Sequence, residues 1–180
     1  MSLLPAPIRR VLTGHNAEGQ TCVIADGPSP VQLTVDARPG YRVTNLWRTK
    51  EHVHVNDPDD ITDHKGILPP TGGTILRIID WPAEPVRTAK EQRALVDQTF
   101  SSLYPDAERN VEGDVDPTMH RTSTVDYALV LEGEIFALLD QEEVLLRAGD
   151  VLIQRGTNHG WANRSGKAAR IAFILIDAQS

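Results

Sequence analysis

The chain has 180 residues, a formal net charge of -7 and one cysteine, and these values exclude several classes of protein. This length is typical of one domain with a core of its own. An acidic chain without basic runs is a poor partner for nucleic acid or for an anionic membrane. A single cysteine excludes an internal disulfide framework and favours a reducing compartment. We therefore expect a cytoplasmic protein that binds a small molecule, with no nucleic-acid or membrane partner.

The N-terminal segment MSLLPAPIRR holds two prolines and lacks the apolar run of a signal peptide or a membrane span. The first half of the chain then alternates apolar segments with polar turns, which is typical of β-strands. Cys22 lies in the run TCVIA, where we expect a small buried hydrophobe and not a reactive thiol. The expected strands span residues 8–13, 21–25, 31–35, 43–49 and 74–80.

Residues 51–73 are acidic and rich in proline and glycine, which predicts a long loop. His52, His54 and His64 lie in it among several aspartates, a composition that resembles a metal site. Donors in a long loop are not preorganised, and acidic loops are usually solvated. We therefore interpret the segment 52–64 as a solvated loop, with a metal site as the less favoured alternative.

A single helix is expected over residues 88–103. Thr88 stands at the N-cap position and Glu91 follows three residues later, which forms a capping box. Pro105 ends the helical pattern. The apolar residues that recur at helical spacing are Leu95, Val96, Phe100 and Leu103.

From Pro117 onward, short strands are separated by glycine turns, which favours an antiparallel sandwich or barrel. Successive side chains of a strand alternate between its two faces. If His120 points inward, alternate side chains that follow it should point inward too. On a later strand, His159 and Trp161 share a face. The side chains expected to follow His120 inward are Thr122, Asp126, Ala128 and Val130.

Segments 127–131 and 171–176 are apolar on both faces and need cover on both. The N-terminal strands, the 88–103 helix or a second subunit must supply that cover. We expect a homodimer that buries one of these faces.

The segment from Met119 to Ile176 resembles the two-motif signature of the cupin superfamily. The matching residues, in chain order, are His120, Asp126, Gly133, Gly149, His159 and Asn163. The resemblance implies an all-β fold, a cupin-like antiparallel β-barrel (jelly roll) with an N-terminal strand arm and one short helix. We place the arm at residues 1–19 and a single barrel at residues 20–178, with the motif region at 117–177.

The same resemblance implies a candidate metal site at the two motifs. His120 matches the first histidine, Thr122 stands where the second would be, Asp126 replaces the usual glutamate, and His159 matches the last histidine. Two imidazoles and one carboxylate are the ligand set of many non-haem iron sites. We expect His120, Asp126 and His159 to hold one divalent ion (Fe, Mn, Zn or Ni), or else a metal-free pocket in which both histidines hydrogen-bond a ligand. Both alternatives stay open on the sequence.

The candidate catalytic residues are His120 and His159, as metal ligands or as acid and base. Thr122, Trp161 and Arg155 are the candidate pocket residues, Trp161 as an apolar wall and Arg155 as a clamp for a carboxylate. The favoured function is an enzyme acting on a small aromatic or carboxylate metabolite inside the barrel, of the dioxygenase, isomerase or dehydratase class. The alternative is a non-catalytic ligand-binding or sensor cupin with a degenerate metal site.

Overall fold

The computed structural model describes residues 5–109 and 116–179, and its strands follow the expected order along the chain. The first half contains β1 Arg9–His15, β2 Thr21–Pro28, β3 Val31–Thr34, β4 Arg42–Thr49, a 3-10 turn at Ile61–Asp63, and β5 Thr74–Trp81. The second half contains α1 Ala89–Leu103, β6 Thr124–Glu132, β7 Glu134–Leu139, β8 Glu143–Arg147, β9 Val151–Arg155, β10 His159–Ala162 and β11 Ala169–Asp177.

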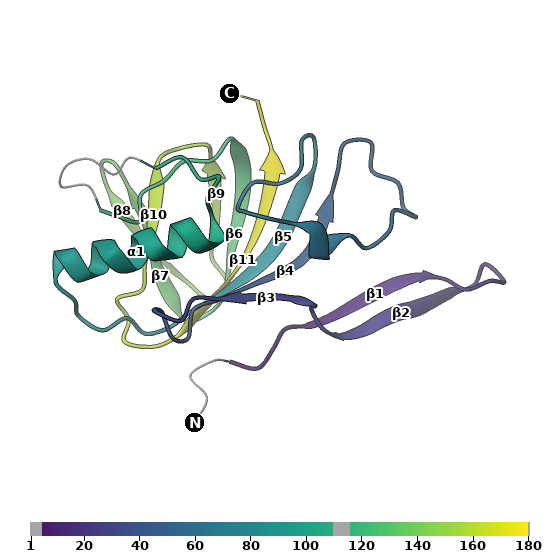
Figure 1. Cartoon of the computed structure of the whole chain (residues 1–180), viewed down its shortest axis with the longest axis horizontal. Helices are drawn as coiled ribbons and strands as arrows, with labels where there is room; N and C mark the ends of the chain where they lie inside the picture. Colours follow the sequence, from purple (N-terminus) through teal and green to yellow (C-terminus); the bar gives the residue numbers. More distant parts are fainter. Residues whose placement is uncertain (1–4, 110–115, 180) are drawn as a thin grey trace.

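In the described part of the chain, two antiparallel sheets form the barrel and α1 lies across it (Figure 1). The larger sheet has the order β3-β4-β5-β11-β6-β9, and the smaller has the order β10-β7-β8. Non-sequential neighbours such as β5, β11 and β6 are typical of a jelly roll, in which the chain crosses between sheets. The predicted all-β fold with one helix is confirmed.

Strand alternation sets the inner face of β6, as the sequence predicted. Asp126, Ala128 and Val130 are buried, whereas Tyr127 and Leu131 on the opposite face of the strand remain exposed. In the single chain, two apolar side chains of the neighbouring strand β9 are exposed beside them, Val151 and Ile153. The dimer that would cover this outer face stays a prediction.

The N-terminal arm is a two-stranded hairpin of β1 and β2 that projects away from the barrel (Figure 1). Arg10 ties it to the body, since its guanidinium donates to the carbonyl of Leu46 at 3.0 Å and to Asp59 at 2.7 Å. Because β2 pairs with β1, the arm extends beyond residue 19, where its end was expected. Cys22 is only half-buried on this hairpin, not a core residue as expected, since the arm lacks a core of its own.

The helix α1 begins at the expected capping box. The backbone N–H of Glu91 donates to the Thr88 hydroxyl at 3.3 Å, and the N–H of Thr88 donates to the Glu91 carboxylate at 2.9 Å. The apolar face predicted from the spacing is buried against the barrel: Leu95, Val96, Phe100 and Leu103, together with Thr99. Within the described ranges, no helix is long and apolar enough to cross a membrane.

Candidate functional site

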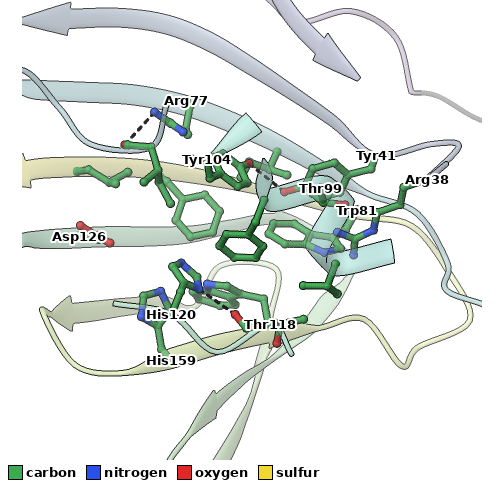
Figure 2. Close-up of a pocket in the computed structure, with 17 residues that line it drawn as sticks. Arg38, Tyr41, Arg77, Trp81, Thr99, Tyr104, Thr118, His120, Asp126 and His159 are labelled. Carbon is green, nitrogen blue, oxygen red and sulfur yellow. Dashed lines mark hydrogen bonds between the residues drawn. The ribbon is translucent and has the colours of Figure 1, made fainter. Parts of the chain in front are cut away.

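A cavity with a volume of about 60 Å³ lies inside the barrel beneath α1. Figure 2 shows the side chains that line it. An engineered cavity of about 150 Å³ is known to hold benzene, so a substituted ring would enter here only if α1 or its side chains move outward. Most of the lining is apolar or aromatic. The residues are Arg38, Tyr41, Ile67, Arg77, Ile79, Trp81, Val96, Thr99, Phe100, Tyr104, Thr118, His120, Asp126, His159, Trp161, Phe173 and Leu175.

His120 and His159 are held next to each other by their own backbones. The N–H of His120 donates to the carbonyl of His159 at 2.8 Å, and the N–H of His159 donates back at 2.9 Å. The two imidazole centroids lie 4.3 Å apart. The close approach depends on Gly160, because a Cβ there would lie 2.4 Å from Thr118 Oγ1 and 3.2 Å from Met119 Sδ. The predicted common cavity of the two histidines is therefore present.

Backbone carbonyls fix the tautomer of both imidazoles. Nδ1 of His120 lies 2.9 Å from the Thr118 carbonyl oxygen, and Nδ1 of His159 lies 3.0 Å from that of Thr157. A carbonyl oxygen only accepts, so each Nδ1 carries the hydrogen and each neutral ring keeps a lone pair on Nε2. The site thus holds two adjacent Nε2 acceptors.

Burial keeps both rings uncharged at neutral pH. The pKa of His120 is lowered to about 3, first by burial and then by the neighbouring His159. Burial also lowers the pKa of His159. Removal of an imidazolium from water disfavours the charged form, and two cations at this separation would repel each other. The pair can therefore accept protons but carries no charge before a ligand binds.

An aromatic cluster forms the wall beside the histidines. The ring of Trp161 lies edge-on to that of Phe173 at 5.3 Å and to the His159 ring at 6.1 Å. Trp81 packs against Phe173 at 6.2 Å and against Tyr41 at 5.3 Å. Aromatic pairs at 4.5–7 Å favour tilted and edge-to-face geometry, so this wall suits a further ring. Trp161 was predicted to line the pocket, whereas Trp81 and Tyr41 were not recognised.

Two arginines also reach the cavity, and the sequence interpretation missed both. Arg38 pairs with Glu84 and lies 4.2 Å from the centroid of Tyr41. Arg77 is 1% exposed and comes from the middle of β5. The segment TILRIID carried a signal for Arg77, because a cation between Leu76 and Ile78 is unusual in a strand apolar on both faces.

Comparison with known proteins places the chain in a family. The family model described as Cupin domain matches residues 110–176. The cupin-domain-containing oxidoreductase fogC of Aspergillus ruber is 39% identical over 175 residues, 93% of this chain and 71% of that protein. The chain belongs to the cupin family. A second cupin-domain-containing oxidoreductase, srdD of Neurospora crassa, is 36% identical over 189 residues, 97% of this chain and 80% of that protein. Phomopsin biosynthesis cluster protein C' of Diaporthe leptostromiformis is 32% identical over 180 residues, 94% of this chain and 78% of that protein.

The metal set expected of a cupin is not assembled as three donors. Among the described residues, no group of three His, Cys, Asp or Glu side chains lies close enough to hold a metal ion. Asp126 stands apart from His120 and His159 on β6 (Figure 2). The two imidazoles could supply two donors, but Asp126 does not complete a set with them. A metal in this cupin stays a prediction, and no step below depends on one.

Asp126 nonetheless faces the cavity as a buried acid. Burial raises its pKa to about 6, while a hydrogen bond from Thr124 and the charge of Arg77 act in the opposite direction. Its Oδ1 has no hydrogen-bond partner among the residues that the structure describes. An unpartnered buried acceptor costs free energy, which a ligand donor would recover.

Two of the predicted pocket residues lie outside the cavity of this cupin. Arg155 is exposed at the end of β9, because Asp126 pairs with Gln154 in the sheet and Gln154 takes the buried position. The Gln154 amide donates to the carbonyl of Thr157 at 3.0 Å and so supports the loop before His159. Thr122 is buried, but its hydroxyl lies 2.7 Å from that of Thr124 and does not line the cavity. The expected roles of Arg155 as a carboxylate clamp and of Thr122 as a pocket residue are corrected accordingly.

The 52–64 loop divides into an exposed and a buried part. His52 and His54 are exposed, as expected of a solvated loop. Asp60 accepts two hydrogen bonds from Arg48, at 2.7 and 2.8 Å, and this anchors the loop to β4. His64, by contrast, is 4% exposed and contacts Arg77. The end of the loop at His64 therefore packs against β5.

Proposed function

We propose that this cupin is an enzyme that acts on a small aromatic metabolite inside the barrel, with His120 and His159 as its proton-transfer groups. The observation that carries the proposal is the pair of neutral imidazoles beside an aromatic cavity. Each Nδ1 faces a backbone carbonyl, and each Nε2 is without a hydrogen-bond partner among the described residues. General acid–base catalysis needs a positioned group that can take a proton and return it. Two adjacent imidazoles supply both roles.

In this scheme the Nε2 atom of one imidazole accepts a proton from a carbon or hydroxyl of the bound molecule. The imidazolium formed in this step then returns the same proton, directly or through the second Nε2. Return to another atom of the substrate gives an isomerisation, and return to a departing hydroxyl gives a dehydration. Imidazoles with a pKa as low as that of His120 are weak bases in the free protein. A negative charge that develops on the substrate would raise their pKa toward the working pH, because an opposite charge favours the protonated ring.

A second candidate is oxidation of the same molecule. The names of the Aspergillus ruber and Neurospora crassa relatives, both cupin-domain-containing oxidoreductases, favour it. A two-electron acceptor supplied from outside the described chain would take the electrons of the substrate, and the imidazole pair would accept the proton that the substrate releases.

Turnover of a panel of aromatic aldehydes, phenols and aromatic acids, followed by mass spectrometry, tests the proposal. An unchanged mass with a new retention time, or loss of water, indicates proton transfer. Loss of two hydrogens or gain of oxygen indicates oxidation. His120→Asn and His159→Asn should abolish turnover, whereas His15→Asn, on the exposed arm, should not. Full turnover in the His120→Asn/His159→Asn double variant would overturn the assigned roles, and binding without turnover would favour the ligand-binding alternative.

A further inference from the structure

The buried guanidinium of Arg77 lies in the cavity wall, and no carboxylate of residues 5–109 or 116–179 forms an ion pair with it. Its Nη2 donates to Nε2 of His64 at 3.0 Å, to the carbonyl of Ile67 at 3.1 Å and to that of Gly66 at 3.3 Å. Burial, and secondly Arg77 itself, lowers the pKa of His64 to about 4, so this imidazole is a neutral acceptor. All three acceptors are therefore uncharged.

The other buried arginines of the described chain each form an ion pair with a carboxylate. Arg42 donates to Asp80 at 2.7 and 3.0 Å, and Arg38 pairs with Glu84. For Arg77, the described residues show no such ion pair; Asp106 and Asp126 attract its charge from a greater distance, and Asp126 lines the same cavity. Within the described part of the chain, the Nε of Arg77 has no hydrogen-bond partner. A buried cation with an unpartnered donor costs free energy until an anion reaches it.

The surroundings of Arg77 indicate what kind of anion fits. Phe173 pairs with Arg77 across the sheet, and the rings of Trp81 and Trp161 both pack against Phe173. Tyr104 lines the same cavity (Figure 2). Apolar rings do not solvate a small inorganic anion, but they pack well against the ring of an aromatic one. A guanidinium binds a carboxylate through two parallel hydrogen bonds.

We propose that the cavity selects an aromatic carboxylate, with its carboxylate oxygens on Arg77 and its ring against the Trp81–Trp161–Phe173 wall. The inference deepens the proposed function and rests on it for the location of the substrate. It assigns to Arg77 the anion-binding role that the sequence had suggested for Arg155. The ring of the ligand then lies in the same cavity as the Nε2 atoms of His120 and His159.

Benzoate and benzamide are matched probes, because they have nearly the same shape and differ in charge. Isothermal titration calorimetry on the full chain should show benzoate binding about ten- to a hundredfold more tightly than benzamide, as expected for a charge-assisted hydrogen bond. Arg77→Met should remove this preference, and Arg77→Lys should retain part of it. Arg155→Met should keep it, because Arg155 is exposed at the end of β9 and lies outside the cavity.

Equal or tighter binding of benzamide by the wild-type protein would overturn the proposal, as would a preference lost in Arg155→Met and kept in Arg77→Met. If Arg77→Met does not fold, the Nε–H NMR signal of Arg77 in the wild-type protein decides. It should shift with benzoate and not with benzamide, and the absence of that difference would overturn the assignment. Binding preference is measured without turnover, so a benzoate preference in a protein that turns over no substrate contradicts only the enzymatic role. Turnover restricted to neutral aromatics contradicts only the role of Arg77.

Discussion

The neutral state of His120 makes the stability of the fold depend on pH. The pKa of a histidine in an unfolded chain is about 6.5, and burial next to His159 lowers it to about 3 in the folded protein. The unfolded state therefore binds a proton below pH 6.5 that the folded state does not bind. The contribution of the neutral His120 to stability is therefore fully present above about pH 6.5. Below it, the free energy of unfolding falls by about 1.4 kcal/mol for each pH unit. Through His120 alone, a change from pH 7 to pH 5 should lower the free energy of unfolding by about 2 kcal/mol.

His120→Asn tests this reasoning, because the asparagine amide can keep the hydrogen bond to the Thr118 carbonyl but cannot take up a proton. Urea unfolding followed by tryptophan fluorescence at pH 7 and pH 5 gives the loss of stability for each protein. The variant should lose about 2 kcal/mol less than the wild type over this interval. His15→Asn, at an exposed position, is the matched control and should follow the wild type. Equal losses in wild type and His120→Asn would refute the neutral buried imidazole.

Three further changes test other parts of the site. Gly160→Ala should push the segment at Thr118 away from β10 and lower the free energy of unfolding by about 1–3 kcal/mol, as measured by urea unfolding. An unchanged unfolding curve would show that the close approach is not needed. Phe100→Ala should lower the free energy of unfolding by about 3–4 kcal/mol. Toluene should then raise the melting temperature of this variant more than that of the wild type. An equal rise would mean that α1 does not limit the cavity. Asp126→Asn should stabilise the fold by about 2–3 kcal/mol at pH 8 and not at pH 4. The pKa of Asp126 is raised to about 6, so the folded state is destabilised by the ionised carboxylate above that pH. A gain in stability that does not depend on pH would contradict this cause.

Much of the barrel could be predicted because its signals are local. The two-residue strand period assigned the inner face of β6, and Thr88 with Glu91 fixed the start of α1. The spacing of the two motifs also brought His120 and His159 to one cavity. Each of these features depends on neighbours a few residues away or on a pattern that the whole barrel repeats.

The remainder of the site depends on strand register and on pairing between distant segments. Arg155 was expected in the pocket, but the pairing of Asp126 with Gln154 turns Arg155 outward, and one residue of register changes the face of a strand. Trp81 and Arg77 reach the cavity because β5 pairs with β11, about ninety residues later in the chain. No local pattern shows that pairing, although the isolated charge of Arg77 in an apolar strand indicated a special role.

Nitrogen NMR of the histidine side chains tests the central claim most directly, namely that His120 and His159 present two free Nε2 atoms to a ligand in the cavity. Spectra of ¹⁵N-labelled protein at pH 6, assigned with His120→Asn and His159→Asn, report both charge and tautomer. Both rings should be neutral with the hydrogen on Nδ1, and both Nε2 signals should shift when benzoate is added. Rings protonated at both nitrogens, or neutral rings with the hydrogen on Nε2, would contradict the claim.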